Sequence, residues 1–149
     1  MCADQATERR SVLPKEVLAY PCGRPPMAEI LLIEDDLHVR DMMEMMLGSF
    51  GHDVRVAIDG VEGVKLFAEQ PSRLVVTDLL MPRKEGLETI REIKGLCGEV
   101  LILAISGGGL TLSPDGILEV ASRLGADGVL AKPFSADQLR SALDELLAA

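Results

Sequence analysis

Several polar residues with complementary chemistry each follow a short apolar run in this sequence. They are carboxylates, a hydroxyl and a lysine: Asp35, Asp36, Asp78, Ser106 and Lys132. Carboxylates that lie close together repel one another, and a hard divalent cation such as Mg²⁺ relieves this repulsion with oxygen ligands. A lysine and a hydroxyl then suit the oxygens of a phosphoryl group. These residue types indicate metal-assisted phosphoryl chemistry if the fold brings them together.

Each of these residues also has a structural interpretation when it is taken alone. An Asp-Asp pair after a strand is commonly a turn and a helix N-cap, and Asp78 could also be a turn residue. Lys132 could be a solvated surface lysine, and the glycine run 107–109 is a weak phosphate-binding signal without a P-loop. Their joint position favours the chemical interpretation, because all of them follow strands that the sequence predicts.

Apolar runs alternate with amphipathic segments from residue 28 onward. The predicted strands are Glu29–Glu34, Asp53–Ile58, Arg73–Thr77, Val100–Ile105 and Gly128–Ala131. The predicted helices cover 39–50, Gly60–Glu69, Glu85–Leu96, a segment that opens at Ser113-Pro114, and a last segment that opens with the capping box Ser135–Gln138. Strict alternation with continuous apolar strands indicates an α/β fold whose parallel sheet is covered on both faces. In such sheets the functional site lies at the carboxyl ends of the strands.

Composition and charge limit the classes of function. The chain has 149 residues, 48% of them hydrophobic, which is enough for one domain with a buried core and a tail. Lys and Arg number 15 against 24 Asp and Glu, so the formal net charge is −9. A chain this acidic is a poor non-specific ligand for DNA or anionic membranes. No apolar run approaches the about 18–20 residues that span a bilayer, and no signal-peptide pattern is present, so we expect a cytoplasmic protein.

The first 27 residues differ from the rest of the chain. Residues 1–27 carry a net charge of +1 and end in a Pro- and Gly-rich stretch, whereas residues 28–149 carry a net charge of −10. We interpret residues 1–27 as a flexible extension, or as a segment upstream of a true initiator at Met27. The segment 28–149 is predicted to be one domain.

Four motifs lie at the predicted site. They are LLIEDD at 31–36, VVTDLLMPRKEG within 74–86, AISG at 104–107 and LAKPF at 130–134. Together they make residues 28–149 similar to the receiver domain of two-component response regulators. The resemblance implies the flavodoxin-like (βα)5 fold of that family, with a five-stranded parallel sheet in the order 2-1-3-4-5.

The resemblance also implies a magnesium site. In this sequence Asp36 would ligate Mg²⁺ directly, and Asp35 would act mainly through a bound water. Asp78 and the backbone carbonyl of Leu80 would complete the protein ligands.

For the phosphoryl group, the resemblance implies that Asp78 is the acceptor. Lys132 would contact the phosphoryl oxygens, and its peptide bond to Pro133 would be cis. Ser106 would turn toward the phosphoryl group as a switch residue. The donor would be a sensor histidine kinase or a histidine phosphotransfer protein, and the chain would be a signalling module that assists its own phosphorylation and dephosphorylation, not an enzyme.

The sequence departs from the family pattern at three places. Val129 stands where an aromatic switch partner is usual, and the stretch from Ser106 to Lys132 is longer than the family pattern. The chain also ends at Ala149 without an effector domain, which favours a stand-alone regulator that signals to a downstream protein by contact, without direct DNA binding.

Two other functions stay open at this point. A phosphatase of the haloacid-dehalogenase type also uses a strand-end Asp and Mg²⁺, but it needs a second Asp where this chain has Leu80. A degenerate receiver that serves as an unphosphorylated scaffold is disfavoured by the complete set of acids, although Val129 keeps it possible.

Overall fold

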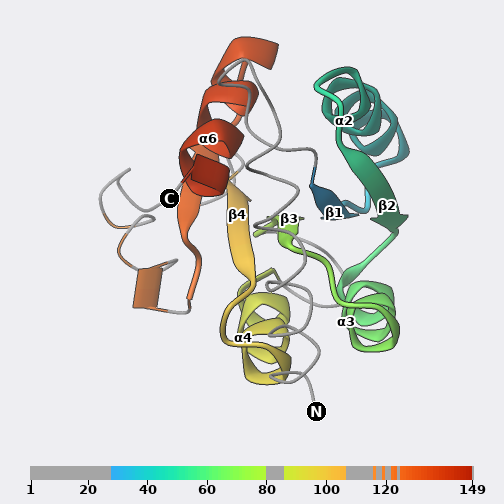
Figure 1. The fold of residues 1–149 in the computed structure, drawn as a ribbon, viewed down its shortest axis with the longest axis vertical. Coiled ribbons are helices and arrows are strands. Elements are labelled where there is room, and N and C mark those ends of the chain that lie inside the picture. Colours follow the sequence, from blue (N-terminus) through green and yellow to red (C-terminus); the bar gives the residue numbers. More distant parts are fainter. Residues whose placement is uncertain are drawn as a thin grey trace.

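Five parallel strands form one sheet in the order β2-β1-β3-β4-β5 (Figure 1). This computed structural model describes residues 28–79, 86–106, 116, 119, 122–123 and 125–148. The strands are β1 (Glu29–Ile33), β2 (Asp53–Ala57), β3 (Leu74–Asp78), β4 (Leu101–Ser106) and β5 (Gly128–Ala131). The strand order and the parallel pairing confirm the predicted fold class.

Helices cover both faces of this sheet. They are α2 (Leu37–Ser49), α3 (Gly60–Glu69), α4 (Gly86–Leu96) and α6 (Ala136–Ala148). Helices α2 and α6 lie on one face, and α3 and α4 lie on the other (Figure 1). The predicted helix that opens at Ser113-Pro114 begins outside the described residues, and its described members Gly116, Glu119, Ser122 and Arg123 are helical. None of the helices in the described part of the chain has the length and apolar character that crossing a bilayer requires.

The continuous apolar strands follow from the two covered faces. Alternate residues of a strand point to opposite faces, so a strand buried on both sides has no polar positions. Leu31 and Ile33 of β1 pack into the cluster under α3 and α4. Ile30 and Leu32 of the same strand pack into the cluster under α2 and α6. The sheet is therefore buried on both faces, and its carboxyl edge is where polar side chains can collect.

Several strand ends differ by one residue from the sequence prediction, and the shift affects the site. Strand β1 ends at Ile33, whereas β3 extends through Asp78 and β4 extends through Ser106. Asp78 is in register with Ile105, and Ser106 is in register with Ala131. The backbone of Asp78 and Ser106 is thus held in the sheet, which fixes both residues more firmly than a loop would.

The predicted capping box opens helix α6. The backbone N–H of Ser135 donates to Oε1 of Gln138 at 2.8 Å, and the backbone N–H of Gln138 donates to Oγ of Ser135 at 3.1 Å. Two amides that the helix itself leaves unpaired are satisfied in this way.

His52 is a buried histidine that holds the start of strand β1. Its Nδ1 accepts a hydrogen bond from the backbone N–H of Ala28 at 3.2 Å. Burial lowers the pKa of His52, although the negative charge of Asp144 opposes this shift. The acceptor role requires the unprotonated nitrogen, so a protonated ring would lose this contact.

We expect His52 to make the free energy of unfolding fall as the pH drops below about 6.5, the ordinary histidine pKa. Below this pH the unfolded chain binds a proton on His52, whereas the folded chain does not, because its His52 pKa is lower. The loss of stability ends once the pH is low enough for the folded chain to bind the proton as well. His52→Asn keeps a neutral acceptor, so it should remove this part of the slope, which cannot exceed about 1.4 kcal/mol per pH unit. Urea unfolding between about pH 7 and about pH 5 measures the difference, with His38→Gln at an exposed position as the control. Equal slopes for wild type and His52→Asn would contradict this expectation.

Candidate functional site

The carboxyl ends of β1 and β3 bring three carboxylates together. One oxygen from each of Glu34, Asp35 and Asp78 lies within 4.8 Å of the others. Glu34 and Asp78 are buried, whereas Asp35 is exposed, so solvent reaches the group from one side. The backbone N–H of Glu34 donates to the carbonyl of Ala57 at 3.1 Å, which aligns the end of β1 with the end of β2. Backbone pairing therefore positions the two buried acids.

Lys132 reaches this acidic group from the end of β5. Its Nζ lies 2.5 Å from Oδ2 of Asp78, as a charged hydrogen bond, and 3.6 Å from Oε2 of Glu34. Its backbone N–H donates to the carbonyl of Ser106 at 2.8 Å, and the peptide bond to Pro133 is cis, as predicted. Burial alone would lower the pKa of Lys132, but the hydrogen bond and charge of Asp78 and the charge of Glu34 outweigh it and raise the pKa. Lys132 is therefore a positive charge directed at the acidic group.

Glu34 is the most constrained acid of the group. Burial raises its pKa to about 7, and the charge of Asp78 adds to the shift. Its Oε1 accepts a hydrogen bond from the backbone N–H of Asp36 at 3.2 Å, but its Oε2 has no hydrogen-bond partner. A buried carboxylate oxygen without a hydrogen bond is costly, and Lys132 at 3.6 Å offsets this cost through its charge alone, so a cation in direct contact would lower the cost further. The carboxylate oxygens of Glu34, Asp35 and Asp78, together with the lack of a hydrogen bond at Glu34 Oε2, thus fit a hard divalent cation such as Mg²⁺.

Asp36 has a different role from the one that the sequence predicts. Helix α2 begins at Leu37, so Asp36 is its N-cap, and its Oδ1 accepts from the backbone N–H groups of His38 at 2.9 Å and Val39 at 3.1 Å. These hydrogen bonds hold the pKa of Asp36 below its ordinary value. Asp36 is not a member of the group of three carboxylates. The geometry brings Glu34 and Asp35 to Asp78 in place of Asp36, so it favours these two acids for metal binding, and the direct ligand role of Asp36 stays an untested prediction.

Of the other predicted site residues, the structure describes Ser106 and Val129 but not Leu80. Ser106 is buried at the end of β4, and the register of β4 and β5 puts it beside Ala131, next to Lys132. Val129 is partly buried and packs against the cluster under α3 and α4. Leu80, whose carbonyl is a predicted ligand, and the glycine run 107–109 lie outside the described residues. The switch roles of Ser106 and Val129 and the ligand role of Leu80 stay predictions.

Glu34 is the residue that sequence reasoning missed. Its signal was present, because an Asp immediately before an amphipathic helix is a favoured N-cap. Assigning the cap to Asp36 leaves Glu34 and Asp35 as the acids nearest to the end of the strand.

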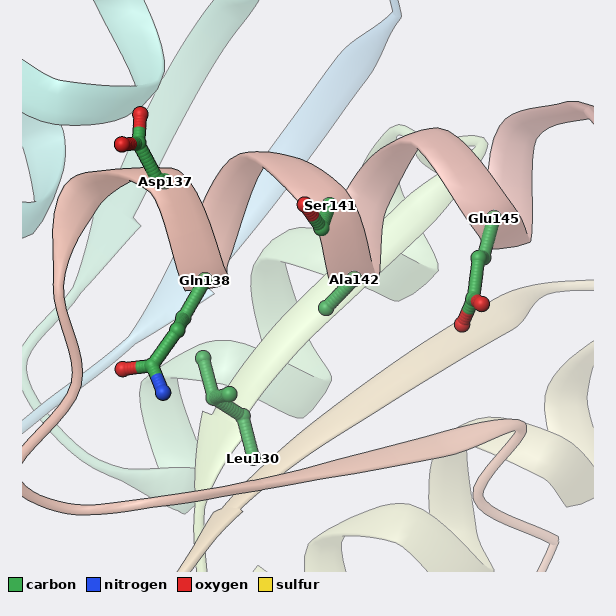
Figure 2. Close-up of a pocket in the computed structure, with 6 residues that line it drawn as sticks. All are labelled: Leu130, Asp137, Gln138, Ser141, Ala142 and Glu145. Atoms are coloured by element: carbon green, nitrogen blue, oxygen red, sulfur yellow. The ribbon is translucent and has the colours of Figure 1, made fainter.

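A shallow hollow elsewhere on the molecule lacks this chemistry. It lies between β5 and α6 and is lined by Leu130, Asp137, Gln138, Ser141, Ala142 and Glu145 (Figure 2). The side chain of Asp137 points to the opposite side of the helix from those of Gln138 and Glu145. Its lining contains no residue of the acidic group and no lysine, so we assign it no part in the chemistry.

Comparison with known proteins places this arrangement in a family. The family model described as response regulator receiver domain matches residues 30–144. The chain belongs to this family. A receiver domain is a signalling module of two-component systems. The acidic group and Lys132 lie at the carboxyl edge of the sheet, where the sequence motifs predict the phosphorylation site.

Known regulators share the receiver domain with this chain. The response regulator MprA of Mycobacterium tuberculosis (strain H37Rv) is 33% identical over 120 residues, which cover 79% of this chain and 50% of MprA. MprA of Mycobacterium sp. (strain KMS) is 34% identical with the same coverage. The chain spans about half the length of the curated relatives that it matches.

Solved receiver domains have the same fold. The Vibrio cholerae chemotaxis protein CheY4 superposes with a TM-score of 0.73 at 25% identity and covers 81% of this chain and 99% of its own. The receiver domain of the Pseudomonas aeruginosa sensor histidine kinase PA1611 superposes with a TM-score of 0.72 at 28% identity. The superposition covers 83% of this chain and 100% of the PA1611 domain. That structure has a magnesium ion coordinated in its active-site cleft.

Proposed function

We propose that this receiver domain accepts a phosphoryl group on Asp78 from a sensor histidine kinase or a histidine phosphotransfer protein. The observation that carries the proposal is the contact of Lys132 Nζ with Asp78 Oδ2 at 2.5 Å, beside the oxygens of Glu34 and Asp35. An acceptor carboxylate, a fixed cation and further acids for a metal are the parts that phosphoryl transfer to a carboxylate requires.

Each residue then has a defined part in the transfer. A carboxylate oxygen of Asp78 attacks the phosphorus in line, the bond from phosphorus to the donor breaks, and the leaving group keeps the electron pair. Lys132 moves from its contact with Asp78 to neutralise charge on the phosphoryl oxygens. Asp35 and Asp78, with Glu34 beside them, would hold Mg²⁺, which supplies further neutralisation of that charge. The product is a high-energy acyl phosphate that can shift the protein between conformations.

The output follows from the same proposal. The phosphorylated domain signals by contact with a downstream protein, in the cytoplasm, and not by contact with DNA. The acidity of the chain supports this choice of partner, because a net charge of −9 disfavours contact with a phosphate backbone. In this proposal the chain assists its own phosphorylation and dephosphorylation without acting on a separate substrate.

Acetyl phosphate, a small-molecule donor, tests the proposal. With Mg²⁺ present we expect mass spectrometry to show one phosphoryl group, mapped to Asp78, and chelation of the metal should prevent the labelling. Absence of labelling in a folded, magnesium-loaded protein would favour the unphosphorylated scaffold. Turnover of a generic phosphate ester would favour the phosphatase.

A further inference from the structure

Gly86 is the first residue of α4, and the fold leaves no space for a side chain there. A Cβ at Gly86 would lie 2.0 Å from the carbonyl oxygen of Asp78, 2.5 Å from Cα of Leu79 and 2.8 Å from the carbonyl carbon of Asp78. All three are backbone atoms, which cannot rotate out of the way. Gly86 is not among the described glycines with a positive φ, which are Gly51 and Gly125. The position therefore demands glycine for space and not for backbone conformation.

We infer that Gly86 is a positioning residue for phosphoryl transfer. Because it has no side chain, the first turn of α4 packs directly on the peptide between Asp78 and Leu79 and fixes the acceptor carboxylate relative to Lys132. This inference rests on the proposed function, since it concerns the geometry of the same acceptor.

The backbone of Leu79, which follows the acceptor, is held from two sides. The backbone N–H of Leu79 donates to the carbonyl of Ile105 on β4 at 2.9 Å. The backbone N–H of Gly86 donates to the carbonyl of Leu79 at 3.0 Å. With β4 on one side and α4 on the other, a displaced α4 either loses its hydrogen bond or moves Asp78.

Other glycines in the described residues show that this contact is unusual. At Gly63 the nearest atoms to an added Cβ belong to the side chain of Ile33, and at Gly125 they belong to the side chain of Lys94. These side chains can adjust. At Gly48 and at Gly95, which lies near the other end of α4, an added Cβ would meet nothing within 4 Å. Gly95 is therefore a matched control for Gly86 in the same helix.

The test compares Gly86→Ala with Gly95→Ala and with Ile93→Val, which trims a fully buried side chain of α4. We expect Gly86→Ala to lower the rate of phosphorylation by acetyl phosphate about 100-fold, the loss that a misplacement of about 1 Å causes. Its Mg²⁺ affinity should fall about 10-fold, because a displaced Asp78 is a poorer ligand. Both controls should keep the wild-type rate and affinity. Each variant is compared under conditions in which circular dichroism shows it to be folded.

The outcomes separate the possible failures. The inference is overturned if a folded Gly86→Ala variant has the phosphorylation rate and Mg²⁺ affinity of wild type. It is also overturned if the variant loses no more of that rate and affinity than Ile93→Val does. If the variant does not fold, it is rebuilt with Gly48→Ala and Gly95→Ala, which should strengthen α2 and α4 at open positions. Failure to fold there as well would make Gly86 a folding determinant and would also overturn the positioning role. A folded wild type that acetyl phosphate does not label would instead contradict the proposed function.

Discussion

Asp78→Asn is expected to abolish phosphorylation by acetyl phosphate, a loss of at least about 1000-fold, because an amide is a very poor nucleophile. The substitution keeps the shape of the side chain and removes one negative charge from the neighbourhood of Glu34. Lys132 loses the negative charge of Asp78 but keeps Glu34 at 3.6 Å and remains 27% exposed, so we expect the fold to persist. Labelling followed by mass spectrometry measures the rate, and circular dichroism checks the fold.

A matched control for this prediction is Asp53→Asn. Asp53 is an exposed residue at the opposite end of the sheet, where β2 begins. Its substitution removes the same charge from the protein without touching the acidic group, and labelling should proceed at the wild-type rate. Undiminished labelling of a folded Asp78→Asn variant would show that another residue is the acceptor.

The second large effect is expected at the metal site, where Asp35 and Asp36 should behave in opposite ways. Asp35→Asn removes a carboxylate from the group of three and should weaken Mg²⁺ binding at least about 100-fold, more than the loss of an outer contact. Asp36→Asn should leave Mg²⁺ binding nearly unchanged, because Asp36 caps helix α2 and Asn caps a helix about as well as Asp does. Calorimetric titration with Mg²⁺ measures both affinities.

A stability measurement provides the complementary test of Asp36. Asp36→Ala removes the acceptor for the N–H groups of His38 and Val39 and should lower the free energy of unfolding. Asp36→Asn should lower it much less. If Asp36→Asn weakens Mg²⁺ binding more than Asp35→Asn does, Asp36 is the direct ligand after all, and the role that we assign to Asp35 is wrong.

Much of the fold could be predicted because it depends on local signals. Residues 30–33 and 100–105 are apolar without alternation, a pattern that is typical of a strand buried on both faces. The capping box of Ser135 and Gln138 is likewise a local pattern, since its two hydrogen bonds join residues three apart. Such signals need no knowledge of distant parts of the chain.

The proximity of Asp78 and Lys132 could also be predicted from the sequence. The only sequence signal that links Asp78 with Lys132 is the position of each at the end of a predicted strand. The two residues are 54 positions apart in the chain, and their side chains make a contact of 2.5 Å. Parallel strands share one carboxyl edge, so residues that follow them meet whatever their separation along the chain. The cis peptide after Lys132 came from the family motif and is present in the structure.

Tertiary structure decided which of three consecutive acids lie beside Asp78, although the N-cap position of Asp36 is itself a sequence signal. Glu34, Asp35 and Asp36 have the same chemistry, and their roles depend on the direction in which each side chain points. That direction is set where β1 leaves the sheet beside Ala57 and where α2 starts at Leu37, so one residue more or less in either element exchanges the roles. The need for glycine at position 86 has the same origin, because it arises from a backbone contact between α4 and the end of β3. Local patterns determine the elements, and packing distances between those elements determine which atoms meet.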